Sequence, residues 1–220
     1  MNLRGRLRGA AWLAAARTGP VSEQWGRDRG TPVDRWYIER FLGRHASDIR
    51  GHVLEVMDDT YTTRFGTGVD AVDILDVDES NRRATLVADL ADPKRFPPAT
   101  YDCVLLTQTL QYVYDLPAAV ESIHRSLRPG GVCLATVPVV SRLDRAGIPR
   151  GEFWRITPVG CERLFGDRFG ADRVEVTACG STLSCVAFLL GLSAEEVGAR
   201  GLLADHPFFP LLVTVRAIRG

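Results

Sequence analysis

Residues 101–138, YDCVLLTQTLQYVYDLPAAVESIHRSLRPGGVCLATVP, decide the fold class of this chain. Two apolar runs, 103–107 and 132–137, flank a segment with helical spacing that ends in the turn 128–131. Continuous apolar runs on either side of a helix are typical of a βαβ unit with parallel, buried strands. We therefore expect an open α/β sheet, and such sheets bind ligands beyond the carboxyl ends of their strands.

Composition limits the classes of partner. A length of 220 residues fits one domain with an extension, and 27 Lys and Arg balance 27 Asp and Glu. A neutral balance gives no electrostatic reason to expect nucleic acid or an anionic membrane. No apolar run approaches the roughly 18 residues of a membrane span. We expect a cytoplasmic protein without a nucleic-acid partner or a membrane span, and the sequence indicates no oligomeric state.

The cysteines indicate reduced thiols rather than a metal or disulfide framework. Their number is odd, at 5, and no C-x-x-C pair is present. Such usage is typical of a reducing compartment, and no zinc-type spacing is visible. We therefore expect no bound metal.

The first 50 residues predict an N-terminal helical extension or lid, and residues 51–220 predict the main domain. The apolar patch 10–16 is short for a signal peptide and is followed at once by Arg17, which favours a short amphipathic helix. Pro32 opens a second helix, in which aromatic and aliphatic residues recur at helical spacing.

The rest of the chain alternates between strand and helix patterns. We expect strands at 53–57, 69–77, 85–88, 103–107, 132–137, 174–177 and 211–218, and helices at 118–127, 158–165, 183–191 and 194–199. The link between the second and third strands is short for a parallel crossover, which normally takes a dozen or more residues. Either the helix there is reduced to a turn, or the second strand ends early, near Asp73.

Several of these segments together resemble one enzyme class. They are VLEV at 53–56, VADL at 87–90, YDCVLLTQTLQYV at 101–113 and LRPGGVCLATVP at 127–138. Over about 51–219 the chain resembles class I S-adenosyl-L-methionine (SAM)-dependent methyltransferases of the compact type 11 kind. RGTPVDRWYIERFL at 29–42 and FWRITP at 153–158 resemble a bacterial subgroup often encoded near glycosyltransferases.

The resemblance implies both a fold and a cofactor. The fold is a Rossmann-like, seven-stranded, mostly parallel sheet with helices on both faces and an antiparallel last strand. The cofactor is SAM, lying across the carboxyl ends of strands one, two and four. Carried over by position, the cofactor-binding residues are Glu55 and Asp58 after strand one, Asp73 or Asp76 after strand two, Asp89 and Leu90 at the adenine, and Thr107 and Gln108 under the sulfonium.

The ribose-binding acid is left open by the sequence. A carboxylate suits the two ribose hydroxyls because it accepts two hydrogen bonds at once. Asp73 is the first choice, and Asp76 and Asp78 are alternatives. Each of these acids, and Asp89 as well, has a plain reading as a solvated turn or a cap.

The loop after strand one departs from the family pattern. The family has an acid-x-Gly-x-Gly-x-Gly turn, whereas residues 55–61 read EVMDDTY, with Met57 where the subgroup keeps a glycine. Glycines let the backbone approach a ligand closely, so their loss indicates a rearranged loop or a site without SAM. Asp58, Asp59 and Tyr61 offer polar contacts instead.

The acceptor side is assigned from position and residue type. Tyr112 and Arg155 are the catalytic candidates, and Trp36, Tyr37 and Trp154 are the substrate-binding candidates. Long loops often carry function, which favours Trp154 and Arg155. An aromatic stripe at helical spacing is more often core than lid, which is the alternative for Trp36 and Tyr37.

Two functions remain in view. The first is SAM-dependent O- or N-methylation of a small molecule, natural product or glycan. The second is a methyltransferase-fold protein with a degenerate glycine motif that binds a partner or catalyses another biosynthetic step. A nucleotide-dependent oxidoreductase is disfavoured because no G-x-G-x-x-G follows the first strand.

Overall fold

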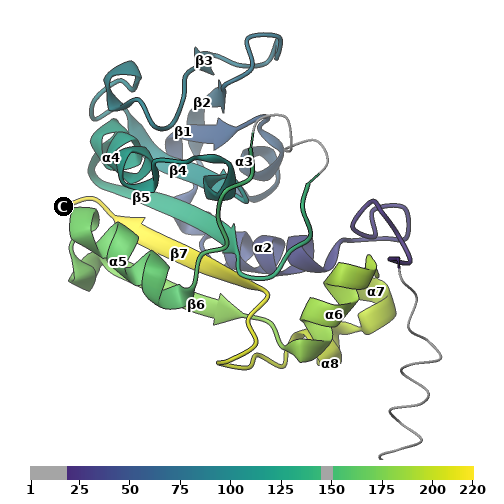
Figure 1. Ribbon diagram of the computed structural model, residues 1–220. Helices are drawn as coiled ribbons and strands as arrows, with labels where there is room; N and C mark the ends of the chain where they lie inside the picture. The colour runs from purple at the N-terminus through teal and green to yellow at the C-terminus, as the bar shows by residue number, and fades with distance from the viewer. Residues whose placement is uncertain (1–18, 145–150) are drawn as a thin grey trace, which may run out of the picture.

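A computed structural model describes residues 19–144 and 151–220 of the chain, which form one seven-stranded sheet (Figure 1). The strand order is β3-β2-β1-β4-β5-β7-β6, and only the pairs made by β7 are antiparallel. The strands are β1 Gly51–Val56, β2 Val69–Asp76, β3 Leu86–Val87, β4 Tyr101–Thr107, β5 Leu127–Pro138, β6 Val174–Cys179 and β7 Leu212–Ile218. The expected fold class, including the antiparallel last strand, is confirmed.

Helices cover both faces of this sheet and form two apolar layers with it. One layer holds α4 (Leu116–Ser126) and α5 (Pro158–Phe169). The other holds α2 (Val33–Arg44), α3 (Thr60–Phe65), α6 (Thr182–Leu190), α7 (Ala194–Val197) and α8 (Ala199–Leu202). Short 3₁₀ turns complete the list: η1 Ala46–Asp48, η2 Pro93–Arg95, η3 Leu110–Tyr112 and η5 Ala171–Arg173.

The βαβ unit of 101–138 is present as expected. Asp115 caps the start of α4, because its carboxylate accepts the Ala118 N–H at 3.0 Å. The helix leads directly into β5. In β5, Leu127 pairs with Tyr101 and Val132 with Cys103, so residues 128–131 bulge out of the ladder. The Pro-Gly-Gly turn therefore lies inside the strand, where Gly130 takes a φ of 79°.

The short link between β2 and β3 contains no helix. Of the two alternatives left by the sequence, the structure has the one in which the crossover helix is reduced to a turn. β2 continues through Asp76, and residues 77–85 form turns. β3 pairs only with the last two residues of β2, Leu75 and Asp76. β3 begins beside the end of β2, so the chain does not have to return along the whole length of β2. The nine residues 77–85 are therefore enough to connect the two parallel strands.

The N-terminal extension lies only partly within the described residues, since 1–18 are outside them. Helix α2 buries Val33, Tyr37, Ile38, Phe41 and Leu42 in the same apolar layer as the sheet. Its first turn lies at the carboxyl edge, because Arg35 donates to the hydroxyl of Tyr61, whose N–H is bound by Glu55 near the end of β1. The division into 1–50 and 51–220 stays a prediction.

All five cysteines are buried and unpaired. Burial raises the pKa of the Cys161 thiol to about 12 and that of Cys179 to about 11. They behave as small apolar residues of the core, as the positions of Cys103 and Cys133 in apolar runs indicate.

Asp102 joins the amino ends of three strands. Its Oδ2 accepts the His52 N–H at 2.8 Å and the Arg128 guanidinium at 2.6 Å. A Cβ at Gly51, which has a φ of 63°, would lie 2.3 Å from the same oxygen. Burial raises the pKa of Asp102, but the interactions with His52 and Arg128 outweigh burial and hold this pKa below its usual value. The acid that precedes the β4 apolar run thus fixes how β1, β4 and β5 begin.

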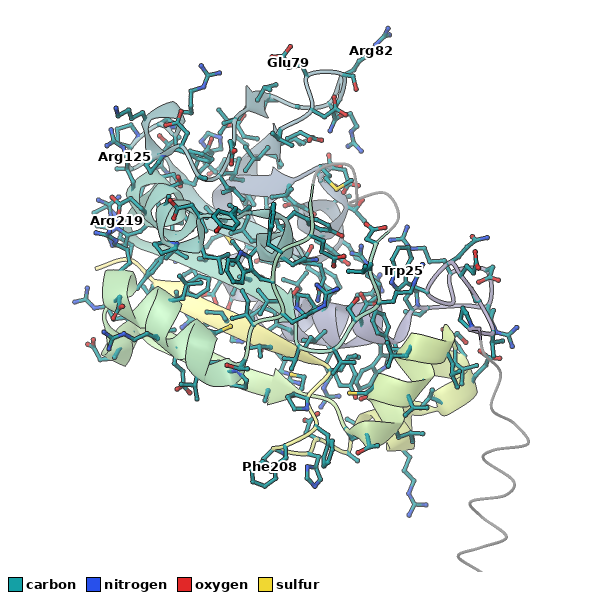
Figure 2. All side chains as sticks on the ribbon, in the orientation of Figure 1. Trp25, Glu79, Arg82, Arg125, Phe208 and Arg219 are labelled. Atoms are coloured by element: carbon teal, nitrogen blue, oxygen red, sulfur yellow. The ribbon has the colours of Figure 1, made fainter. Side chains whose placement is uncertain are left out.

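Asp102→Asn is expected to lower the free energy of unfolding by about 1 kcal/mol at neutral pH, because a partly exposed charged acceptor is lost. The folded-state pKa is depressed, so the contribution is present above the unfolded value of 3.8 and is lost as the pH falls through the folded value. Urea unfolding of both proteins from pH 7 to pH 2 measures this. Glu79→Gln, at a side chain that points into solvent in Figure 2, is the control. A difference that persists unchanged below pH 3 contradicts the assignment.

Candidate active site at the carboxyl edge of the sheet

Glu55, at the end of β1, holds the loop that follows it. Its side chain is 3% exposed, and its two oxygens accept the N–H groups of Tyr61 at 2.9 Å and Thr62 at 2.7 Å. These amides belong to the first turn of α3, whose N–H groups have no partner within the helix. Burial raises the pKa of Glu55, and the contacts with Thr62 and Tyr61 oppose that rise. The carboxylate therefore sets the position of α3 rather than pointing freely at a ligand.

Met57 adopts the backbone conformation that a glycine would favour. Its φ is 71°, in the left-handed region, and its side chain is 65% exposed. Its N–H donates to the Leu75 carbonyl at 2.9 Å, and its own carbonyl accepts the Asn81 side-chain amide at 2.9 Å. Met57 therefore follows a path that a glycine would take without strain, at a cost of roughly 1–2 kcal/mol for a non-glycine residue.

Asp76 and Asn81 tie the end of β2 to the loop after β1. Asp76 is 8% exposed, and its oxygens accept the Asp78 N–H at 2.9 Å and the Asn81 amide at 2.8 Å. Since Asn81 also binds the Met57 carbonyl, one amide group joins both strand ends. Asp76 keeps further acceptor capacity, because each carboxylate oxygen has two lone pairs.

Asp73, the first choice for the ribose contact, lies elsewhere. It precedes the end of β2 by three residues, and its carboxylate is bound by three side chains. These are His52 Nε2 at 2.9 Å, Thr85 Oγ1 at 2.6 Å and Tyr101 Oη at 3.2 Å. The structure thus gives Asp73 a role in joining strands, and Asp76 occupies the strand end.

The residues expected at the adenine have clear structural partners. Asp89 is exposed, and its carboxylate accepts the Ala91 N–H at 2.8 Å, which is the local cap that its plain reading predicts. Leu90 is 5% exposed, and its carbonyl accepts the Ser122 hydroxyl at 2.6 Å. Both residues come within three positions of the end of β3, so they border the same edge of the sheet.

Thr107 and Gln108 close the end of β4, where the chain leaves the sheet abruptly. Gln108 has a φ of 50°, and its N–H donates to the Thr136 carbonyl at 2.9 Å. Its carbonyl accepts the Gln111 side-chain amide at 2.8 Å. A non-glycine residue in this region is strained, and such strain clusters at functional sites.

A layer of loops lies beyond the ends of β4 and β5. Tyr112 donates its hydroxyl to Asp144 at 2.9 Å, and Arg155 binds Glu152 at 2.8 Å and the Arg142 carbonyl at 3.1 Å. The Arg142 guanidinium lies 3.7 Å from the ring of Trp25, labelled in Figure 2. The segment before α2 and the loop after β5 are therefore joined over this edge.

These contacts bear on the predicted acceptor-side roles. Burial raises the pKa of Tyr112, and its partner Asp144 raises it further. Its phenol thus keeps its proton at neutral pH and is poorly suited to act as a base. The Trp154 indole donates to the Val113 carbonyl at 3.0 Å and the Tyr114 carbonyl at 3.2 Å, and its ring lies on the rim with that of Tyr114.

Trp36 and Tyr37 are separated from this region. Tyr37 is 4% exposed, and its hydroxyl donates to the Leu202 carbonyl at 2.7 Å. Both rings line a small cavity of about 30 Å³ between α2 and β6, together with Cys179 and Asp205. The structure makes Tyr37 a core residue, which was the alternative reading of this aromatic stripe.

Sequence reasoning missed three residues that the structure brings to the edge. Asn81 joins two strand ends from within a loop that carries no recognisable pattern. Arg35 donates to the Tyr61 hydroxyl, which fixes α2 against α3. Asp34 is a carboxylate on the buried stripe of α2, and that position was visible in the helical spacing.

Two absences hold within the described ranges, 19–144 and 151–220. No cluster of three or more His, Cys, Asp or Glu there could hold a metal ion. No helix in those ranges is long and apolar enough to span a bilayer.

Comparison with known proteins shows a partial family match. Residues 50–135, which hold β1 to β4 and most of β5, match the model of a family described as a methyltransferase domain. No curated protein matches the chain. Residues 50–135 are thus similar to the methyltransferase domain family, and the strand order belongs to the fold that the solved structures below share.

Solved structures agree in fold at low identity. A SAM-dependent methyltransferase from Mesorhizobium loti is 15% identical, with 84% of this chain and 98% of that one covered and a TM-score of 0.55. A putative SAM-dependent methyltransferase from Listeria monocytogenes is 13% identical over 85% and 97%, with a TM-score of 0.55. Phosphoethanolamine N-methyltransferase 2 from Haemonchus contortus, in complex with SAM, is 12% identical over 84% and 52%, with a TM-score of 0.51.

Glu55→Gln is expected to lower the free energy of unfolding by about 2 kcal/mol, because an amide N–H₂ replaces one acceptor and faces a buried backbone donor. Thermal and urea unfolding measure the loss. Glu175→Gln, at an exposed position of β6, is the matched control and should change stability by less than about 0.5 kcal/mol. Equal effects of the two substitutions contradict the role given to Glu55.

Proposed function

We propose that the protein transfers a methyl group from SAM to the hydroxyl or amine of a small-molecule or glycan acceptor. The observation that carries the proposal is the glycine-like path of the loop after β1, held by Glu55 on one side and Asn81 on the other. A left-handed conformation at this position is the one that a glycine would favour. The family match of residues 50–135 supports the same conclusion.

The residues at this edge fit the charge of the cofactor. SAM is cationic at sulfur, and the edge carries the carboxylates of Glu55, Asp58 and Asp76. Asp76, at the end of β2, would accept the ribose hydroxyls, and Asp89 with Leu90 would border the adenine. The loop 57–61 would hold the methionine end, with Thr107 and Gln108 beneath the sulfur. Oxygen acceptors of this kind attract a cation most where water is displaced.

The chemistry asks mainly for alignment and exclusion of water. SAM, when bound, supplies an electrophilic methyl group on a sulfonium. The chain positions an acceptor over the end of β4 by the joined loops 19–31 and 139–144, and holding two reactants in line removes much of the entropic barrier. The aromatic rim of Tyr114, Phe153 and Trp154 offers apolar faces against which an acceptor can pack.

The alternative, a methyltransferase-fold protein without transfer activity, rests on one observation. Met57 places a bulky, exposed side chain where the family has none, directly at the strand ends. A side chain that fills the cofactor position would remove binding altogether. The two functions differ in whether S-adenosylhomocysteine (SAH), the demethylated cofactor, binds.

Calorimetric titration of SAH tests the proposal and its ribose acid together. We expect micromolar binding by the unaltered protein and a loss of roughly tenfold in Asp76→Asn, because a charge-assisted contact is removed. Asp73→Asn is the matched control, with reduced thermal stability but little change in SAH affinity. No binding by the unaltered protein at millimolar SAH contradicts the function. Weakening by Asp73→Asn alone contradicts the choice of Asp76.

Met57→Gly separates the two functions. The free energy of unfolding should rise by about 1 kcal/mol, because left-handed strain is removed while some chain entropy is returned to the unfolded state. We expect SAH affinity to stay within about threefold of the starting value, since the path of the loop is already the one a glycine takes. Met57→Ala, which keeps the Cβ, should give no stability gain. A gain in SAH affinity above roughly tenfold favours the degenerate site.

A further inference from the structure

Asp34 is a carboxylate in a position that the fold otherwise reserves for apolar groups. The buried stripe of α2 includes Ile38 and Phe41, and Asp34 falls on it four and seven residues earlier. Side chains of a helix lean toward its N-terminus, so this carboxylate is directed past the first turn. That turn lies at the carboxyl edge of the sheet.

One oxygen of this carboxylate lacks a partner within the described residues. Asp34 Oδ1 is buried, and it makes no hydrogen bond with the described residues. Burial raises the pKa of Asp34, and this rise is opposed by the charges of Arg35 and Arg27 and by the backbone N–H groups of Arg35 and Asp34. A helix-start role explains an acidic group in the first turn of α2 and its interaction with these N–H groups, but it leaves Oδ1 without a hydrogen bond. A buried oxygen without a donor costs free energy and calls for a ligand or a proton.

Asp34 and the end of β4 lie toward the same edge of the sheet. Cys103 and Leu105 pack in the same apolar layer as α2, and Thr107 is the next residue on that face. Moving along α2 toward its N-terminus leads from Ile38 to Asp34, just as moving along β4 leads from Leu105 to Thr107. Both series therefore end at the same edge.

The first turn of α2 is held firmly there. Arg35 donates to the Tyr61 hydroxyl, and the Tyr61 N–H is bound by Glu55. Thr31, just before the helix, accepts the Ala194 N–H through its carbonyl at 2.7 Å. Asp34 is thus anchored on both sides, which is what a positioned catalytic group requires.

We propose that Asp34 is a catalytic residue on the acceptor side, whose Oδ1 receives the hydrogen of the acceptor's nucleophile. The inference rests on the proposed function and narrows it to acceptors that present an O–H or N–H. The nucleophile's lone pair forms the bond to the methyl carbon, the carbon–sulfur bond breaks with its electron pair going to sulfur, and the proton passes to Asp34. Nucleophiles without a transferable proton would not use this group.

Three ligands test this assignment without a known acceptor. SAH is neutral at sulfur, SAM carries a sulfonium, and sinefungin carries an amino group in place of the transferable methyl; the rest of each molecule is shared. We expect Asp34→Asn to weaken sinefungin by roughly tenfold, since its ammonium would contact Oδ1, while SAH changes by less than about threefold. Glu39→Gln, which removes a carboxylate from another face of α2, is the matched control and should leave all three affinities unchanged.

The outcomes separate the possible failures. Thermal stability of Asp34→Asn should equal or exceed that of the unaltered protein, because a buried carboxylate oxygen without a partner has been replaced. Equal weakening of all three ligands, or lost stability with unchanged ligand ratios, makes Asp34 a structural group and overturns this inference alone. Absence of SAH binding by the unaltered protein overturns the proposed function as well.

Discussion

The carboxylate of Glu55 is the contact on which the carboxyl edge depends. It binds two backbone N–H groups of α3 from within a buried strand end. That single arrangement fixes where α3 begins, so the four residues between must follow a tight path, and Met57 takes a left-handed conformation within it. Tyr61, positioned by the same contact, then receives Arg35 and aligns the start of α2. The loop, two helices and a strand end are thereby related through one side chain.

Much of the scaffold could be predicted because its signals are local. The apolar runs at 103–107 and 132–137, the Pro-Gly-Gly segment between them and the helix start after Pro32 all appear in the structure. Strand boundaries differ by a few residues, since a strand end depends on neighbours that a single run does not reveal. β3 is the clearest case, being only two residues long because β2 offers it no more.

The site itself could be predicted only in part, because its contacts join distant segments. Nothing in VDIL indicates that Asp73 is bound by His52 and Tyr101, so Asp76 is the acid left at the strand end. Similarly, Trp36 and Tyr37 belong to the same aromatic pattern in the sequence. The hydrogen bond from the Tyr37 hydroxyl to the distant Leu202 carbonyl, which shows that this hydroxyl is buried, is visible only in the structure. The substitution at Met57 was visible, but its conformation was not, since φ is set by Asn81, Leu75 and Glu55 together.

The buried cysteines have a consequence for how the molecule can be followed in solution. Cys133 and Cys161 belong to the layer of α4 and α5, whereas Cys103, Cys179 and Cys185 belong to the layer of α2 and α6. Thiols react as thiolates, and burial disfavours that form in all of them. Alkylation in the native state must therefore await opening of the layer in which each thiol lies. The alkylation rates of the two groups of cysteines therefore report separately on the opening of the two apolar layers.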